Sequence, residues 1–288
     1  MAFDIRGRVV VITGGNAGIG QAAATTLSRA GARVVITSRD PEKGEAARRQ
    51  IETPGGAPVA CVHLDLASFD SIRACAATLL ERYSSLDILI NNAGLILSAR
   101  SETREGFETT LGVNHVGHFL LTELLLERIR ASAPSRIVVV SSAAHRRAIT
   151  GLDFSDLQSE RHYRPFIVYA RSKLANLYHA RELARRLAES GVTVNAVHPG
   201  TVATRFALDG DTQGWLQQFY RFFSPFLLTP ERGARPLIHA AASPELTGKT
   251  GLYLVRCRPV SPSRAGRNDA AARRLWELSE KWVAEGRP

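Results

Sequence analysis

The chain has 288 residues, 44% hydrophobic and 22% charged, a composition typical of a globular domain and not of a disordered or fibrous chain. No apolar run approaches the roughly 20 residues that span a bilayer, no signal peptide is recognisable, and three scattered cysteines favour a reducing compartment, so we expect a cytoplasmic protein without a membrane span. The net charge of +10 is spread over scattered arginines rather than a basic block with aromatic residues, which argues against a nucleic acid partner but is compatible with anionic substrates or cofactors.

Strands and helices are predicted to alternate along the chain. Apolar runs predict strands at 8–13, 33–38, 58–64, 86–90, 136–140, 192–197 and 251–255. Helical patterns run up to about residue 30, then cover about 41–52, 69–83, 103–112, 114–131, a segment that carries Tyr169 and ends near 190, and 268–284. This alternation predicts right-handed crossovers and a doubly wound α/β fold, a parallel sheet between two helical layers. With no repeat or linker, we expect a single domain over residues 1–288.

A glycine-rich turn joins the first strand to the first helix. It reads Gly14-Gly15-Asn16-Ala17-Gly18-Ile19-Gly20. Glycines there allow a tight turn, and the helix N-terminus supplies N–H groups and a favourable dipole for a pyrophosphate. The spacing GxxxGxG departs from the general GxGxxG pattern, and a glycine-rich turn without a ligand is the alternative.

The end of the second strand predicts the choice of cofactor. A site for NAD(H) usually has an acid there, on the ribose 2′-hydroxyl, whereas this chain has Ser38 and then Arg39. The guanidinium of Arg39 can hold a 2′-phosphate, so we expect NADP(H); an ordinary solvated arginine is the alternative. Asp65-Leu66 ends the third strand, where the adenine is expected to lie.

Polar and small residues follow the remaining strands. These are Asn91-Asn92-Ala93-Gly94 after the fourth, Ser141-Ser142 after the fifth, and His198-Pro199-Gly200-Thr201-Val202-Ala203-Thr204 after the sixth, with Asn114 at the start of a long helical pattern. Ligands of doubly wound sheets bind outside the carboxyl ends of the strands, so these residues are expected to line one crevice.

Tyr169 and Lys173 are four residues apart in a helical pattern, and therefore lie on the same helix face. A neighbouring ammonium lowers the pKa of a phenol from about 10 toward neutrality, so that the phenol can act as a general acid or base. Alone, the pair could be a chance spacing. Its position beside the predicted crevice favours a catalytic role.

These motifs in this order resemble the short-chain dehydrogenase/reductase family. The resemblance covers nearly the whole chain and is greatest to the branch of retinol-dehydrogenase-like proteins and WW-domain oxidoreductases, which is close to the protochlorophyllide reductases. It rests on Thr13-Gly14-x3-Gly18-Ile19-Gly20, Asn91-Asn92-Ala93-Gly94, Val113-Asn114-His115-Val116-Gly117-His118-Phe119, Ser142, Tyr169-x2-Ser172-Lys173-Leu174-Ala175-Asn176 and Pro199-Gly200.

The resemblance implies a Rossmann fold and an NADP(H)-dependent interconversion of a carbonyl and an alcohol. Tyr169 would transfer the proton, Lys173 would favour the phenolate and bind the nicotinamide ribose, and Ser142, rather than Ser141, would bind the substrate oxygen. Asn114 would bend its helix and hold a water linked to Lys173. The cofactor would also contact Asn16, Asn92, Ala93, Gly94, Pro199, Gly200, Val202 and Thr204. The family often forms homodimers or homotetramers through the helices that start near Asn114 and Tyr169.

The segment 205–229 is rich in apolar and aromatic residues. In the resembling family it forms a substrate lid, which implies a lipophilic aldehyde, ketone or alcohol; core packing or a surface contact is the alternative. A non-catalytic NADP(H)-binding sensor or scaffold remains the alternative to an enzyme. The pair His115 and His118 lacks the further ligands of a metal site, so we expect no metal, and no GxSxG motif supports a hydrolase.

Overall fold

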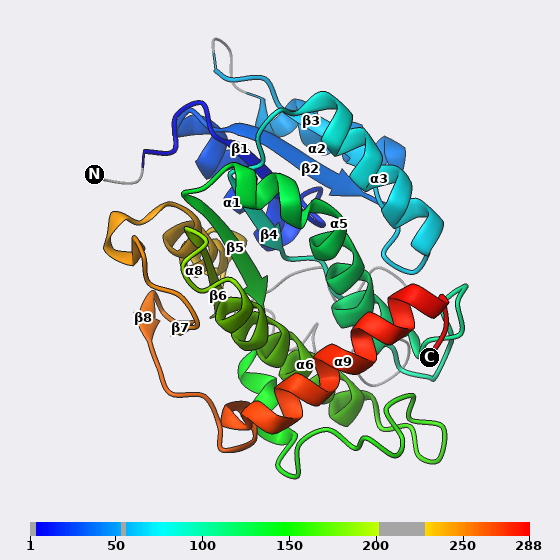
Figure 1. Ribbon diagram of the computed structural model, residues 1–288. Coiled ribbons are helices and arrows are strands. Elements are labelled where there is room, and N and C mark those ends of the chain that lie inside the picture. Colours follow the sequence, from blue (N-terminus) through cyan, green and yellow to red (C-terminus); the bar gives the residue numbers. More distant parts are fainter. Residues whose placement is uncertain (1–3, 53–55, 202–227) are drawn as a thin grey trace.

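The structure is a computed structural model that describes residues 4–52, 56–201 and 228–288. Its strands form one eight-stranded sheet in the order β3-β2-β1-β4-β5-β6-β7-β8, parallel throughout except for the antiparallel pair β7 and β8 (Figure 1). The strands are β1 Val9–Ile12, β2 Arg33–Ser38, β3 Ala60–His63, β4 Ile88–Asn91, β5 Ser135–Val140, β6 Val192–His198, β7 Tyr253–Val255 and β8 Arg258–Pro259. The predicted doubly wound α/β fold is confirmed.

The sheet is buried on both faces, which explains the continuous apolar runs of its strands. Along β1 the side chains alternate: Val9 and Val11 belong to one hydrophobic cluster, and Val10 and Ile12 belong to the other. Each of these valines and the isoleucine is at most 2% exposed. The sheet therefore divides the core into two parts, each closed by its own layer of helices.

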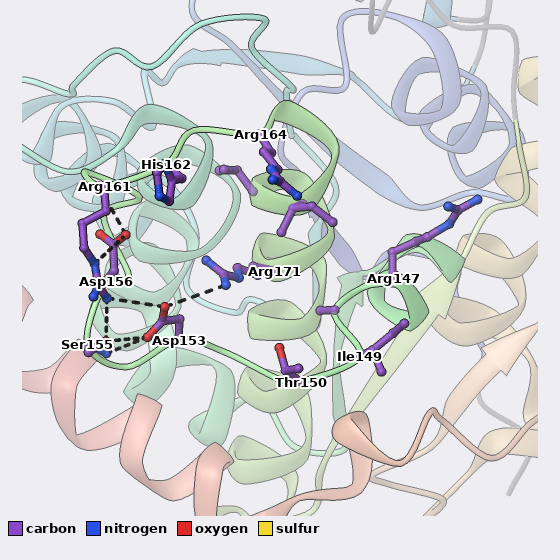
Figure 2. A pocket seen from close by; sticks show the side chains of 13 residues that line it. Arg147, Ile149, Thr150, Asp153, Ser155, Asp156, Arg161, His162, Arg164 and Arg171 are labelled. Carbon is purple, nitrogen blue, oxygen red and sulfur yellow. Dashed lines mark hydrogen bonds and ion pairs between the residues drawn. The ribbon is translucent and has the colours of Figure 1, made fainter.

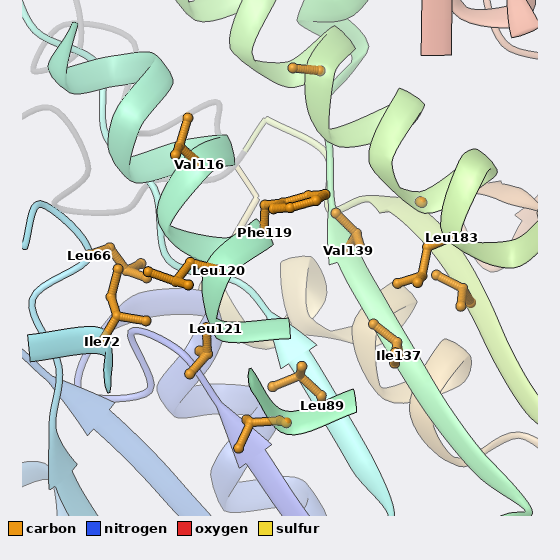
Figure 3. Close-up of a cluster of buried hydrophobic side chains, with 14 of the residues drawn as sticks. Leu66, Ile72, Leu89, Val116, Phe119, Leu120, Leu121, Ile137, Val139 and Leu183 are labelled. Carbon is orange, nitrogen blue, oxygen red and sulfur yellow. The ribbon is translucent and has the colours of Figure 1, made fainter. Parts of the chain in front are cut away.

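One helical layer contains α1 Gly18–Arg29, α2 Pro41–Ile51 and α8 Pro230–Ala242. The other contains α3 Phe69–Arg82, α5 Gly117–Ala131 and α6 Pro165–Arg186, and Figure 3 shows side chains of α5 meeting those of β4 and β5 in its core. Helix α8 and strand β8 were not predicted. Over the described ranges, no helix combines the length and the hydropathy that crossing a bilayer requires.

The C-terminal helix α9, Asp269–Glu285, packs along α6 on the outside of this second layer (Figure 1, red). Trp276 meets Phe119 of α5 edge to face, with 4.9 Å between ring centroids, and lies 5.8 Å from the ring of His179 of α6. His115 Nε2 is 2.9 Å from Ser279 Oγ. The helix predicted at 268–284 is therefore present and is part of the core. Contact between copies through the helices that start near Asn114 and Tyr169 stays a prediction.

The predicted helix at 103–112 is wrong over its first half. Glu102 and Glu108 form an antiparallel bridge around Gly106, whose φ is +87°, and helix begins only with α4, Thr109–Leu111. The carboxylate of Glu108 accepts hydrogen bonds from Thr110 N and Leu111 N and so fixes this start. A π-helical turn, Gly112–Val116, then leads into α5.

Candidate active site

The glycine-rich turn has the shape of an anion site. Gly14 and Gly18 have positive φ angles, +63° and +54°. A Cβ atom on Gly20 would lie 2.5 Å from Gly14 O and 2.6 Å from Asn92 Nδ2, so only glycine fits. Ala17 at the N-cap of α1 offers no capping side chain, and the first turn contains no acid. The N–H groups and the positive dipole of α1 therefore remain available, which fits the pyrophosphate of a dinucleotide.

Replacing Gly20 by alanine should weaken cofactor binding at least tenfold, because the new methyl group must displace the backbone carbonyl of Gly14 or the amide of Asn92. Fluorescence titration with NADPH measures this. Gly7→Ala is the control for an added methyl group: the φ of Gly7, +74°, strains an alanine, but no atom lies within 4 Å of the place that the methyl group would take. Equal affinities for both variants would contradict the role of the turn.

Thr13, the last residue before this turn, joins the first and fourth strands to α5. Its Oγ1 accepts hydrogen bonds from Asn92 N (2.8 Å) and Ala93 N (3.0 Å), and it lies 2.9 Å from His118 Nε2. His118 Nδ1 lies 3.2 Å from the carbonyl oxygen of Asn114, which can only accept, so Nε2 accepts from Thr13. Burial, and then the charge of Lys173, lowers the pKa of His118 to about 3 and keeps it neutral.

At the end of β2, the nearest acidic residue, Asp40, is the N-cap of α2. The carboxylate of Asp40 accepts hydrogen bonds at 3.0 Å from Glu42 N and Lys43 N and so caps α2. Ser38 is 3% exposed and its Oγ donates to Asp40 O, whereas Arg39 is exposed. At the end of β3, Asp65 accepts from Ala67 N, and the carbonyl of Leu66 lies against Gly117. Both capping hydrogen bonds are to Asp40 Oδ1, and Asp40 Oδ2 lies 3.6 Å from Lys43 Nζ, so the carboxylate serves mainly the start of α2.

Asn114 is fully buried at the centre of the π-helical turn. Its side chain accepts from Leu95 N (2.8 Å) and donates to Leu95 O (2.9 Å) and to Ser172 Oγ (2.9 Å). Ser172 in turn donates to Tyr169 O at 2.8 Å. Asn114 thus ties the loop after β4 to the turn of α6 between Tyr169 and Lys173, and π-helical turns of this kind often occur at functional sites.

Lys173 is 3% exposed, and its Nζ donates to Val140 O at 3.2 Å. Burial lowers the pKa of this lysine from 10.5 to about 8. A Cβ atom on Gly94 would lie 3.2 Å from Lys173 Nζ and 3.0 Å from Asn114 Oδ1. The ammonium, the asparagine and the glycine backbone therefore meet at one point, at the carboxyl ends of β4 and β5.

The two serines after β5 have different environments. Ser141 is 1% exposed and its Oγ donates to Lys173 O at 2.7 Å, so it fixes α6 against the sheet. Ser142 is half-buried, and its Oγ accepts from Ala144 N at 3.1 Å. Tyr169 is also half-buried, with 5.7 Å between its ring centre and Lys173 Nζ. The Ser141 hydroxyl uses its hydrogen in the bond to Lys173 O. The Ser142 hydroxyl donates to no residue in the described part of the chain, so its hydrogen remains available for a substrate oxygen.

After β6, Pro199 and Gly200 are half-buried, and Gly200 has a φ of +92°. Leu228 N donates to Thr201 O at 2.9 Å, so the two described ends of the apolar segment meet beside Gly200. Val202, Thr204 and nearly all of the predicted lid 205–229 lie outside the described residues. Thr13, His118 and Ser172 support the site but were not among the predicted site residues. The sequence offered one signal for them: Ser172 follows Tyr169 by three residues, so a hydrogen bond back to the carbonyl of Tyr169 could be expected.

Strand order, an uncapped glycine turn and a buried lysine beside a tyrosine define the class of dinucleotide-dependent oxidoreductases. The sequence profile described as short chain dehydrogenase matches residues 8–213. The chain belongs to the short chain dehydrogenase family, and it is similar to retinol dehydrogenases.

Two human relatives illustrate the similarity. Retinol dehydrogenase 12 is 46% identical over 277 residues, and retinol dehydrogenase 11 is 44% identical over the same length; each match covers 96% of this chain and 86% of the relative. Among solved structures, an uncharacterized protein from Mycobacterium paratuberculosis is 34% identical with a TM-score of 0.77, covering 98% of this chain and 96% of that chain. The Pseudomonas aeruginosa RhlG/NADP active-site complex is 28% identical with a TM-score of 0.69, covering 88% and 96%.

Proposed function

We propose that this protein is an NADP(H)-dependent oxidoreductase that interconverts a carbonyl and an alcohol on a lipophilic substrate. The observation that carries the proposal is the buried ammonium of Lys173 beside Tyr169, close to Gly94 and Asn114 at the carboxyl edge of the sheet. Burying an ammonium this deeply costs free energy, and titratable groups in such environments cluster at functional sites.

The chain's own residues would position the substrate and move the proton. The Lys173 ammonium favours the phenolate of Tyr169, so the phenol can give its proton to a carbonyl oxygen or take one from an alcohol. Ser142 can donate to the same oxygen, because Ala144 N occupies a lone pair and not its hydrogen. Asn114 holds α6 and the loop after β4 in register. The bound nicotinamide would supply or accept the hydride.

The preference for NADP(H) is supported by the end of β2, where Arg39 is exposed and the carboxylate of Asp40 is used by α2. The similar RhlG structure is a complex with NADP. A 2′-phosphate would meet the guanidinium of Arg39, while Asp40 is engaged by the start of α2 and by Lys43; charge-assisted hydrogen bonds to phosphate are strong.

Replacing Arg39 by alanine should lower the affinity for NADPH about 10–100-fold, because a charged hydrogen bond to the 2′-phosphate is lost. The affinity for NADH should fall less than about threefold. Dissociation constants for both cofactors from fluorescence titration give the ratio. Arg33→Ala, at the opposite end of β2, is the control and should leave the ratio unchanged. Equal losses for the two cofactors at position 39 would remove the basis for the assignment.

A lipophilic substrate is supported by the similarity to retinol dehydrogenases and by the apolar composition of 205–229, whose described ends meet beside Gly200. The test is a carbonyl panel with NADPH, comparing kcat/KM for decanal and for a short polar ketone. Preference for the polar ketone would reject the lipophilic substrate class.

The enzymatic function has its own test. Binding of NADPH without reduction of any carbonyl, together with no effect of Tyr169→Phe, would reject the proposal that the protein is an enzyme.

A further inference from the structure

A hollow of about 610 Å³ lies between η2 (Ala143–Arg147), the loop that follows it and the first two turns of α6 (Figure 2). None of the residues assigned above to the cofactor or to catalysis lines it. It therefore requires an explanation of its own.

The lining carries four arginines but only two carboxylates, those of Asp153 and Asp156. Arg161 engages both, with nitrogen–oxygen distances of 3.6 Å and 3.4 Å. The hydroxyl of Ser155 is the main cause, ahead of the neighbouring arginines, that lowers the pKa of Asp153, so this carboxylate is ionised at neutral pH. Arg171 reaches Asp153 only at 4.0 Å. The two negative charges are thus largely used by one arginine.

Arg164 is uncompensated. Its guanidinium makes no hydrogen bond or ion pair with any residue in the part of the chain that the structure describes, and it stands at the N-cap of α6. A cation there opposes the positive end of the helix dipole, and the first turn contains no acid. Helices α2, α3, α8 and α9 are capped by Asp40, Ser68, Thr229 and Asn268.

Arg164 and Arg171 are seven residues apart, so they share one face of α6, two turns along the helix. In Figure 2 Arg164 lies at the start of α6, the guanidinium of Arg171 is turned toward Asp153, and Ile149 and Thr150 come from the loop after η2. Ile149 is 84% exposed, and the half-buried Ile167 contributes further apolar surface to the lining. The lining therefore combines the arginines of α6 with aliphatic side chains from α6 itself and from the loop after η2.

We propose that this hollow binds an amphipathic anion, a phosphate or carboxylate group attached to an aliphatic chain. Arg164 and Arg171 hold the charged group, and Ile149 and Ile167 contact the chain. The same chemistry is present in a free alkyl phosphate and in an acidic lipid head group at a bilayer surface.

Dodecyl phosphate below its micellar concentration, titrated calorimetrically into the full chain, tests the proposal. We expect it to bind at least tenfold more tightly than dodecanol or inorganic phosphate, and we expect Arg164→Gln and Arg171→Gln each to weaken it about tenfold or more. Arg82→Gln, a surface arginine at the end of α3, is the matched control and should bind like the unmodified chain. Equal binding of dodecanol, or unchanged binding by both α6 variants, would overturn the proposal.

A vesicle-binding experiment distinguishes the two sources of the anion, an acidic lipid head group and a free ligand. Sedimentation with phosphatidylcholine vesicles containing phosphatidic acid, lost on Arg164→Gln, would assign an acidic lipid head group. Binding of the monomeric amphiphile alone would assign a free ligand. Circular dichroism and NADPH titration of each variant exclude misfolding. Because the measurement is amphiphile binding and not turnover, its failure would leave the proposed oxidoreductase untouched.

Discussion

Tyr169→Phe is expected to lower kcat by about 10²–10⁴-fold, the usual contribution of a positioned general acid or base. The variant loses one hydroxyl on a half-buried ring, and the ring still lies beside Lys173. Affinity for NADPH should therefore change little. Steady-state kinetics with decanal, together with cofactor titration, separates the two effects.

The same helix offers a matched control. Tyr178 is 1% exposed, and its hydroxyl donates to Ala265 O at 2.8 Å, on the side of α6 that faces α9 and not the sheet edge. Tyr178→Phe removes one buried hydrogen bond, at about 1 kcal/mol of stability, and should keep kcat. If both variants lose activity equally, Tyr169 has no special part in proton transfer.

Lys173→Met should make the cofactor-free protein more stable at pH 7 while abolishing most turnover. Burial lowers the pKa of Lys173 from 10.5 to about 8, which corresponds to about 3 kcal/mol of free energy spent on holding the ammonium. Val140 O keeps a donor in the variant, since Asn176 Nδ2 also binds it at 3.0 Å. The net gain in free energy of unfolding is then about 2–3 kcal/mol, an example of stability sacrificed for activity.

The gain should depend on pH in one direction. Between about pH 8 and 10.5 the unfolded chain keeps the Lys173 proton that the folded chain has lost, so the stability of the unmodified protein rises through this window and approaches that of the variant. Urea unfolding at several pH values follows the difference. Lys249→Met, at an exposed lysine, corrects for general alkaline effects. A difference that is constant from pH 7 to 10.5 would contradict the lowered pKa.

The sheet could be predicted because each of its long strands is buried on both faces and therefore reads as a continuous apolar run. The candidate site was predicted from the strand ends, the helical spacing of Tyr169 and Lys173 and the family resemblance, and the strands concerned are neighbours in one parallel sheet. Helix 103–112 could not be placed correctly, because the cap that fixes its start is a glutamate, Glu108, which is an uncommon N-cap. The polar residues around it resemble the first turn of a helix.

Helix α8 was overlooked although its start is written in the sequence. Thr229 caps it, Pro230 occupies the first position and Glu231 follows in the first turn, a common start signal. Pro236 within the helix argues locally against it. The role of His118 was also out of reach, since its partners Thr13 and Asn114 are brought together only by tertiary structure.

Because α9 covers α5 and α6, this part of the core can form only late during synthesis of the chain. The hydrogen bond between His115 and Ser279 joins residues 164 positions apart, and Trp276 and Trp282 close over Phe119 and Phe107. A ribosome releases α5 and α6 long before the helix that seals them, so this side of the core cannot be completed while the last turns of α9 are still in the exit tunnel. Contacts of such long range are also the slow ones to form, which leaves the aromatic surface of α5 open to chaperones for much of translation.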